Sequence, residues 1–453
     1  MEGFVSRPLA GWGRYPVEPG QLFRPERRAG VAAILSAGAP GTFVPRGLGR
    51  SYGDAALNRD GGVISTLRLN RFLAFDAESG LLHCEAGVSF AEIIAAFLPR
   101  GWFLPVTPGT KFVSVGGAIA MDVHGKNHHR DGAIGSFVVD LELLTPAGEV
   151  LTCSPTILPE IFWATVGGAG LTGVILTARI RLQRVDSAYV QVDYRRAPDI
   201  EAAFAGLAAA DERYQYSVAW IDCLKGGRSL GRSVLMGGNP APLDRVRRQT
   251  STPLALPRKR AKGVPFDFPA FTLNRLSIAA FNALYYGMHP SAEGRLVDLD
   301  TYFYPLDGVQ NWNRIYGRRG FIQYQVALPP ASGRAGLIAL LERFSRSRRA
   351  SFLAVLKRFG PGDAGLLSFP MSGYTLALDL PVTSGLVPFL QELDQLVLAH
   401  GGRIYLAKDS VCTPESFAAM YPRLPEFRAV QRALDPEGRL SSSLARRLRI
   451  LAG

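Results

Sequence analysis

Short runs of alternating apolar and polar residues, joined by glycine-rich segments, fill the chain between residues 30 and 185. Residues 41–47 (GTFVPRG) predict a strand that enters a turn, and residues 90–101 (FAEIIAAFLPRG) predict an amphipathic helix that ends at Pro99 and Gly101. Residues 138–153 predict a hairpin, and the apolar run 171–185 predicts a long strand. This pattern is typical of an α+β domain.

A different pattern begins after Tyr189. Strand-like runs alternate with amphipathic helical stretches, the former at residues 216–223, 320–329, 352–360 and 374–381, the latter at 332–347 and 386–402. An antiparallel sheet with flanking helices on one face accounts for this order. The pattern therefore predicts a second domain, which follows a first domain over residues 1–188.

Polar residues recur on one face of two of these predicted strands. Period-2 alternation places Gln323 and Gln325 on one face, and it places Lys357 on the same face as Leu353 and Val355. Such side chains on a sheet face require a polar ligand or partner, unless the face is an exposed edge.

Residues 251–271 interrupt the second domain with a proline-rich segment that contains the basic run Arg258-Lys-Arg-Ala-Lys. We expect a mobile loop without regular structure. It is either a solvated loop or a segment that docks on a membrane or lipid.

Composition narrows the choice of partners. The 453-residue chain is 47% hydrophobic and 20% charged, as in globular proteins with a sizeable core, and its net charge is +13. No nucleic-acid-binding motif is present, so a polyanionic ligand or a lipid surface is favoured over nucleic acid. Neither a signal peptide nor a transmembrane helix is visible, which predicts a cytoplasmic or peripheral membrane-associated protein. The four cysteines are widely spaced and predict reduced, structural thiols.

Glycine clusters mark three loops, at residues 45–58, 105–122 and 164–175. Glycine lets the backbone wrap closely around a ligand and lets successive N–H groups form an anion-binding concavity. In the second loop, Gly116 and Gly117 precede a predicted helical start, a common phosphate site. The first loop has neither the dinucleotide fingerprint nor the Walker A spacing. Each loop alone is typical of a tight turn, but the three together indicate an extended ligand with a pyrophosphate.

The stretch 117–131 holds three of the six histidines. Asp122, His124, His128 and His129 could in principle bind a metal. The adjacent pair His128-His129 diverges on any regular element, and Gly125 disfavours a rigid helix. We therefore expect no metal, with His124 facing a ligand and His128 and His129 holding the loop.

Several motifs resemble a known family. RGLGRSYGD, PGTKFVSVGGAIAMDVHGKNHH and FWATVGGAGLTGVI are similar to the FAD-binding half of the vanillyl-alcohol-oxidase (PCMH-type) superfamily. Within it, MDVHGKNHH, LKRFGPG, SFP, IYLAKDS and MYPRLPEF resemble the decaprenylphosphoryl-β-D-ribose 2′-oxidases. The similarity runs from about Gly11 to Leu451.

The resemblance implies a fold, a reaction and partners. The fold is a two-lobed FAD-binding domain over residues 1–188, a substrate-binding cap domain over residues 189–402, and a C-terminal segment, 403–453, that returns to the first domain. The reaction is oxidation of the C2′ hydroxyl of a polyprenyl-phosphoryl-β-D-ribose to the 2′-keto sugar, with the hydride passed to FAD. A separate short-chain NAD(P)H-dependent keto-reductase then completes epimerisation to the arabinose donor of cell-envelope glycans.

The resemblance also implies roles for individual residues. Lys408, His124 and Tyr52 are the catalytic candidates: Lys408 near the N1–C2=O edge of the flavin, Tyr52 beside the ring, and either Lys408 or His124 as the base. The expected cofactor-binding residues are Arg46, Gly47, Leu48, Gly49, Arg50, Ser51, Tyr52, Gly53, Asp54, Gly109, Thr110, Gly116, Gly117, Ala118, Asp122, His124, Gly125, Asn127, Gly167, Gly170, Gly173 and Lys408. The expected substrate residues are Trp220, Tyr304, Gln323, Gln325, Lys357, Thr375 and Ala377.

The chain departs from related sequences at three positions. Many members of the superfamily attach FAD through a histidine in the first glycine loop, where this chain has Arg50, which predicts non-covalent FAD. Mycobacterial members carry Asn and Cys where Thr375 and Ala377 stand here. A thiol is therefore unnecessary for turnover, and inhibitors that capture that cysteine should fail.

Two alternatives stay open at this point. The first keeps FAD but changes the substrate to a soluble alditol or aldonolactone. The second is a non-catalytic metal- or nucleic-acid-binding protein.

Overall fold

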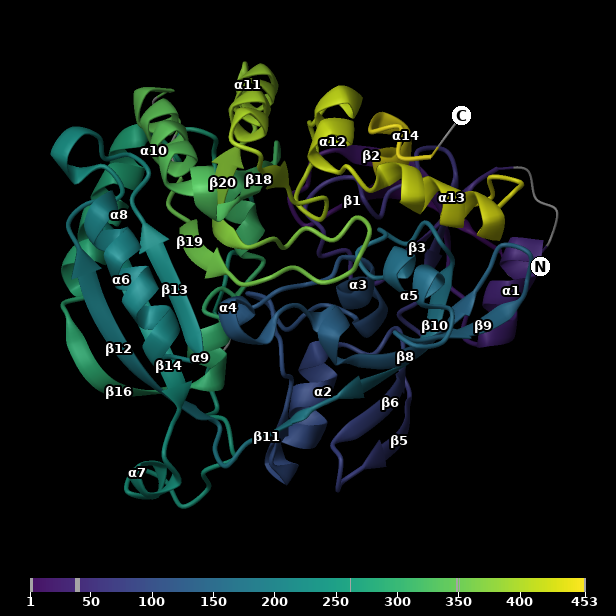
Figure 1. Ribbon diagram of the computed structural model, residues 1–453, viewed down its shortest axis with the longest axis horizontal. Coiled ribbons are helices and arrows are strands. Elements are labelled where there is room, and N and C mark those ends of the chain that lie inside the picture. The colour runs from purple at the N-terminus through teal and green to yellow at the C-terminus, as the bar shows by residue number, and fades with distance from the viewer. Residues whose placement is uncertain (1–2, 37–40, 261, 348, 350, 452–453) are drawn as a thin grey trace.

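The computed structural model describes residues 3–36, 41–260, 262–347, 349 and 351–451. Figure 1 shows two halves side by side, with the last helices of the chain lying over the half that contains both termini. The α+β architecture with a second, antiparallel-sheet domain agrees with the sequence prediction.

The first domain contains two sheets, which form its two lobes (Figure 1). One has the order β1-β2-β4-β3 and is accompanied by α1 (Arg28–Ser36); its strands are Val5–Ala10, Val17–Phe23, Gly62–Ser65 and Phe43–Arg46. The other has the order β5-β6-β10-β8-β9, with strands Phe72–Asp76, Leu81–Glu85, Val174–Arg181, Val138–Leu144 and Val150–Cys153. A two-stranded pair joins β7 (Trp102–Phe103) to β11 (Gln183–Arg184). The predicted hairpin and long strand are thus confirmed.

The first domain also contains several short helices, and their ends are fixed by local capping interactions. The helix predicted at residues 90–101 is α2 (Phe90–Phe97), which begins at a capping box: Ser89 Oγ accepts from Glu92 N at 3.1 Å, and Glu92 accepts from Ser89 N at 2.7 Å. A single 3₁₀ turn follows and ends at Gly101, whose φ of 80° lies in the left-handed region. The remaining helices are α3 (Val115–Ala120), α4 (His128–Asp131) and α5 (Pro159–Thr165). Gly116 and Gly117 lie inside α3 rather than before it, a correction that follows from Ser114, which caps the helix.

The cap domain is built on an antiparallel sheet of the order β16-β12-β14-β13-β19-β20-β18-β21. Its strands are Ala292–Asp298, Tyr189–Ala197, Ser233–Pro240, Tyr216–Ile221, Ala354–Phe359, Gly373–Pro381, Phe321–Leu328 and Arg403–Ile404. Its helices are α6 (Ile200–Arg213), α7 (Leu243–Arg247), α8 (Arg275–Met288), α9 (Leu299–Phe303), α10 (Pro330–Ser347) and α11 (Leu386–Ala399).

The two faces of the cap sheet differ in chemistry. Ile322, Tyr324, Leu356 and Leu378 alternate along their strands onto the face that α6, α10 and α11 cover, and they belong to the largest apolar cluster. The intervening residues of the same strands point to the opposite face. The predicted period-2 alternation is confirmed.

The C-terminal segment first joins the cap sheet and then returns to the first domain. β21 pairs with β18, after which α12 (Pro414–Met420) contacts α11 and β21, α13 (Leu424–Leu434) contacts α5 of the first domain, and α14 (Ser443–Arg447) follows (Figure 1). Leu440 forms a parallel bridge with Phe43, and Ser443 N donates to Leu57 O at 2.8 Å. The domain boundaries at residues 188 and 402 stay predictions: β12 of the cap sheet begins at Tyr189, and β21 (Arg403–Ile404) belongs to the same sheet.

The proline-rich segment 251–271 contains one regular contact that the sequence did not indicate. Lys262–Gly263 form β15, which pairs in parallel with β17 (Val309–Gln310). The expectation of no regular structure is therefore wrong at this point, because a partner distant in sequence supplies the hydrogen bonds. Ala261 of the basic run lies outside the described residues.

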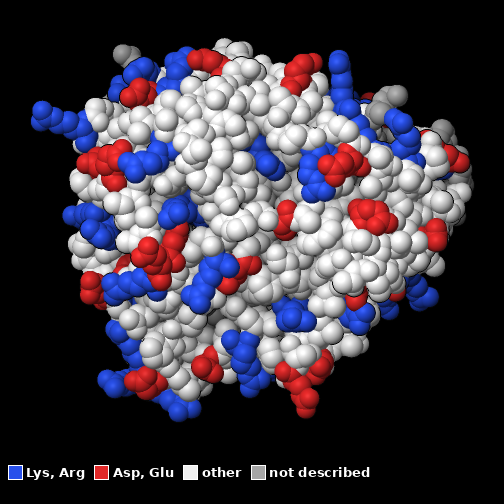
Figure 2. All heavy atoms as spheres, viewed as in Figure 1, with Lys and Arg blue, Asp and Glu red and all other residues white. Residues whose placement is uncertain are grey.

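The surface of the protein carries charges of both signs. Figure 2 shows basic and acidic side chains interspersed on the face in view, without one continuous basic field.

The four cysteines are free and buried, as predicted. Among the described residues, no helix combines the length and apolar character that crossing a bilayer requires.

Arg447 joins the end of the chain to the first glycine loop. Its Nε lies 2.8 Å from Asp54 Oδ2, and its Nη2 lies 2.9 Å from Asp409 Oδ2. Both carboxylates are buried, and together they raise the pKa of the guanidinium in spite of its burial.

We predict that Arg447→Met lowers the free energy of unfolding by about 3–5 kcal/mol, because it leaves two buried carboxylates without their cation. Urea denaturation of the holoprotein measures this change. Arg432→Met, which removes an exposed arginine of α13, is the control and should change stability by no more than about 0.5 kcal/mol. Equal unfolding curves for the two variants would contradict a role for the Arg447 ion pairs.

Candidate active site

A cavity of ≈ 570 Å³ lies between the first domain and the polar face of the cap sheet. The three glycine loops line one end of it. Gln323, Gln325, Lys357, Thr375 and Ala377 line it from the cap sheet, and Lys408 lines it from the C-terminal segment. Residues far apart in sequence thus meet at one site.

The glycine loops form a cradle that larger residues would fill. A Cβ atom on Gly47 would lie 2.0 Å from Ser114 Oγ, so the first and second loops can approach only through a glycine. Gly170 has a φ of +75°, and a Cβ there would lie 2.8 Å from Pro45 Cγ. Arg46 braces the first loop by donating to Ala10 O at 2.7 Å and to Ala56 O at 3.0 Å.

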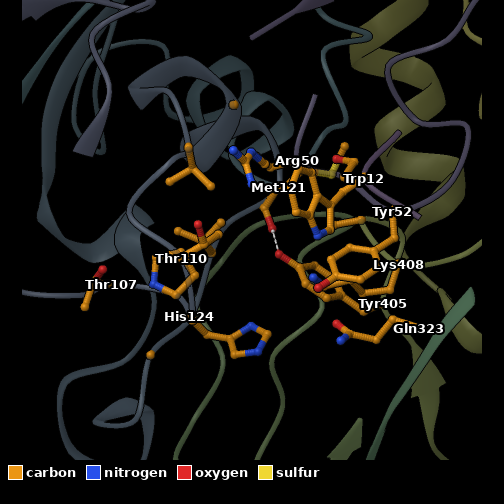
Figure 3. Close-up of a pocket in the computed structure, with 18 of the residues that line it drawn as sticks. Trp12, Arg50, Tyr52, Thr107, Thr110, Met121, His124, Gln323, Tyr405 and Lys408 are labelled. Carbon is orange, nitrogen blue, oxygen red and sulfur yellow. Dashed lines mark hydrogen bonds between the residues drawn. The ribbon is translucent and has the colours of Figure 1, made fainter. Parts of the chain in front are cut away.

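Lys408 lies close to side chains of the first glycine loop and of strands β18 and β20. Its Nζ is 3.7 Å from the centroid of the Tyr52 ring, and Figure 3 shows Lys408, Tyr52 and Gln323 on the same side of the cavity. Behind them, Asp379 accepts from Gln323 Nε2 at 2.5 Å and from Tyr316 Oη at 3.5 Å. Burial lowers the pKa of Lys408, and the Asp379 carboxylate opposes that shift. Burial likewise raises the pKa of Asp379.

In Figure 3, His124 lies at the bottom of the view, between Thr107 on the left and Lys408 on the right. Gln325 Nε2 is 3.0 Å from His124 Nε2 and 3.2 Å from Thr375 Oγ1, so the amide can donate to both. The neutral ring then carries its proton on Nδ1, which has no partner among the described residues. Burial, with Lys357 nearby, lowers the pKa of His124 well below its usual range.

The other two histidines of the motif hold its loop in place. His128 packs on Phe359, with ring centroids 4.4 Å apart, and His129 Nε2 is 3.1 Å from Tyr214 O. No group of three metal-ligating side chains occurs among the described residues, and the His124 and His128 rings are 6.4 Å apart.

Seven predicted site residues lie behind the cavity wall and do not line it: Gly53, Asp54, Ala118, Asp122, Asn127, Gly167 and Tyr304. Several have partners within the protein. Asp122 accepts from Gly135 N at 3.0 Å and from Ser368 Oγ, Asn127 donates to Pro105 O at 2.8 Å, and Tyr304 Oη is 2.6 Å from Thr107 Oγ1. These contacts fix the shape of the wall. The other predicted site residues all line the cavity.

Some lining residues were not predicted from the sequence. Trp12 lies 3.9 Å beneath the Arg50 guanidinium, and Tyr405 donates to Met121 O at 2.8 Å (Figure 3). Lys126 also lines the cavity, although it stands inside the motif that was singled out. At the cap end, a set that we call the aromatic arm extends the cavity towards α8: Tyr194, Trp220, Met236, Tyr285 and His289. Of these, only Trp220 was predicted from the sequence, as a substrate residue.

The residues present fit FAD. The glycine cradle provides backbone N–H groups where a pyrophosphate can approach closely, and Lys408 lies beside the Tyr52 ring in the adjoining space. Arg50 cannot form the covalent link that a histidine makes, and its guanidinium instead stacks on Trp12.

Comparison with known proteins gives two family models and several relatives. The models are described as FAD binding domain, over residues 19–154, and D-arabinono-1,4-lactone oxidase, over residues 321–448. The decaprenylphosphoryl-β-D-ribose oxidase of Mycolicibacterium smegmatis is 39% identical over 453 residues, covering 99% of this chain and 98% of that protein. An uncharacterized Streptomyces coelicolor protein is 38% identical over 369 residues, covering 79% and 98%. Cytokinin dehydrogenase 8 of Oryza sativa subsp. indica is 32% identical over 182 residues, covering 36% and 34%.

The cradle, the cavity and the FAD-binding model together define an FAD-dependent oxidoreductase with a cap domain. This excludes the alternative of a non-catalytic binding protein. Within that class, the chain belongs to the decaprenylphosphoryl-β-D-ribose oxidase family, because the identity extends over 99% of it.

We predict that Asp379→Asn moves the Lys408-dependent limb of the rate–pH profile to lower pH by roughly one unit. The Asp379 carboxylate favours the ammonium form, so its removal lowers the pKa of Lys408 further. Steady-state rates between pH 5 and 10 measure the midpoint.

Asp394→Asn is the matched control, since Asp394 is also buried but pairs with Tyr324 Oη at 2.8 Å, away from the cavity lining. That variant should keep the wild-type midpoint. A shift to higher pH in Asp379→Asn would contradict the coupling between Asp379 and Lys408.

Proposed function

We propose that this protein oxidises the C2′ hydroxyl of a polyprenyl-phosphoryl-β-D-ribose to the 2′-keto sugar. The main support is the M. smegmatis relative, whose name specifies that substrate class. FAD, bound non-covalently, supplies the hydride acceptor. A separate short-chain NAD(P)H-dependent reductase would then complete epimerisation to the arabinose donor for cell-envelope glycans.

Lys408 is the better candidate for the base that takes the hydroxyl proton. A base needs a free lone pair at the working pH. Burial lowers the pKa of Lys408, which makes the neutral amine accessible, whereas Gln325 occupies the acceptor nitrogen of His124. In this arrangement His124, Gln325 and Thr375 orient the sugar, and Tyr52 positions the Lys408 amine.

A soluble aldonolactone is the second candidate substrate. The D-arabinono-1,4-lactone oxidase model that matches residues 321–448 favours it. A small sugar would, however, leave the aromatic arm without a ligand, and the arm suits the start of a prenyl chain.

We expect farnesylphosphoryl-β-D-ribose to bleach the flavin absorbance of the holoenzyme under anaerobic conditions, with D-arabinono-1,4-lactone as the comparison substrate. Bleaching by the prenyl sugar but not by the lactone supports the proposed reaction. Bleaching by the lactone alone would assign the protein to the second candidate.

The exposed face of α8 supports peripheral contact with a membrane that holds such a substrate. Leu276, Leu284 and Met288 are 81%, 58% and 59% exposed, and Phe266 and Phe271 of the preceding loop are 63% and 77% exposed. Exposed basic residues accompany them, at Arg258, Arg260, Lys262 and Arg275. An apolar face beside basic residues is the pattern of an interfacial helix that binds anionic lipid.

The opposite face of α8 leads to the cavity. Tyr285 lines the aromatic arm and lies 4.6 Å from Trp220 between ring centroids. A prenyl chain could therefore pass from the lipid surface to the site along one helix.

We predict that the holoprotein floats with vesicles of phosphatidylcholine and phosphatidylglycerol, and that the double variant Leu276→Ser and Leu284→Ser loses most of this binding. The control pair is Val150→Ser and Ile157→Ser, which removes apolar residues that are 51% and 56% exposed on the first domain. Flotation that is equal in both double variants, or absent in the wild type, would rule out this face as the docking surface.

A further inference from the structure

Two lysines face the cavity beyond the residues assigned to FAD and to proton transfer. Lys357 projects from β19, where it pairs across the sheet with Thr375 of β20. Lys126 comes from the loop between α3 and α4, which Ser217 of β13 anchors by donating to Lys126 O at 2.8 Å. The two side chains thus reach the same space from different domains.

The charges of these two lysines are unmatched. Among the residues that the structure describes, neither ammonium forms an ion pair with a carboxylate, whereas Lys111 lies 2.7 Å from Asp300 and Lys259 lies 2.6 Å from Asp298. Lys126 donates to Tyr302 O and lies 4.3 Å from the centroid of the Tyr302 ring. Burial lowers the pKa of Lys126 to about 7, with a contribution from Lys357, and burial lowers the pKa of Lys357 to about 8.

Such an arrangement costs stability in the free protein. A buried cation without a counterion is unfavourable, and two that repel each other are more so. An anionic ligand between them would remove both penalties. The pyrophosphate of FAD is assigned to the glycine cradle around Gly47 and Gly170, so the space between the two lysines calls for a different anion.

The position of the pair indicates what kind of anion it is. On one side is the polar row of Thr375, Gln325 and His124, and on the other is the aromatic arm that leads to α8. A sugar, a phosphate and a prenyl chain follow one another in the same order along a prenyl-phosphoryl sugar.

We propose that Lys126 and Lys357 form a phosphate subsite that binds the phosphodiester of the substrate, an assignment that rests on the function proposed above. The pair fixes the depth at which the sugar enters, because the phosphate stops between the two ammonium groups. It also selects phosphorylated prenyl sugars over neutral ones.

The test compares farnesyl phosphate with farnesol by calorimetric titration of the holoenzyme. We expect the phosphate to bind at least about tenfold more tightly than the alcohol. Lys126→Met and Lys357→Met should each weaken farnesyl phosphate binding about tenfold and leave farnesol unchanged, and the double variant should lose the preference. Lys225→Met, which removes an exposed lysine, is the control and should behave as wild type.

Folding is checked by FAD content and melting temperature, which should be unchanged or higher in both single variants because a buried charge is removed. A double variant that folds, retains FAD and still prefers farnesyl phosphate would overturn the subsite. So would a wild type that binds the two prenyl compounds equally.

Turnover separates the subsite from the proposed function. If farnesylphosphoryl-ribose is oxidised and its KM is the same in wild type and double variant, the subsite is wrong and the function stands. If no turnover occurs but the lysine-dependent preference persists, the ribose substrate is wrong and the phosphate subsite stands.

Discussion

The ion pairs of Arg447 hold together the two segments on which the active site depends. One carboxylate partner, Asp54, ends the first glycine loop, and the other, Asp409, adjoins Lys408. Backbone contacts reinforce the junction, since Tyr52 N donates to Ala407 O at 2.8 Å and a Cβ on Gly53 would lie 1.8 Å from Asp409 O. The position of Lys408 relative to the flavin loop is therefore set by contacts of its neighbours in sequence, Ala407 and Asp409.

On the polar face of the cap sheet, the side chains that line the cavity form two separate hydrogen-bonded rows. Gln323 and Asp379 stand behind Lys408, whereas Gln325 and Thr375 connect to His124. Gln323 and Gln325 are two positions apart on β18, so both point to the same face of the sheet. Each nevertheless belongs to a different hydrogen-bonded row. The aromatic rings of Phe359, Phe369 and Tyr405 surround His124 and exclude water from that row.

Local features of the sequence predicted much of this structure. The glycine spacing, the amphipathic pattern of α2 and the period-2 alternation of β18 and β19 act over a few residues, so they could be recognised without a fold. The same alternation correctly placed Gln323, Gln325 and Lys357 on the cavity face. What could not be predicted depends on long-range contacts: β21 is only 2 residues long and acquires its strand character from β18, and Asp54 meets an arginine 393 positions later. Lys126 was missed because its significance lies in the absence of a carboxylate partner, a property that only the three-dimensional structure reveals.

The return of the C-terminal segment also bears on biosynthesis. The ribosome makes the first glycine loop before the cap domain, but two residues that complete its surroundings, Lys408 and Arg447, follow the cap domain in sequence. The cap domain, which lies between them in sequence, must therefore be translated before the flavin cradle can close. A chain that lacks the segment from Lys408 to Arg447 therefore lacks part of the cofactor site.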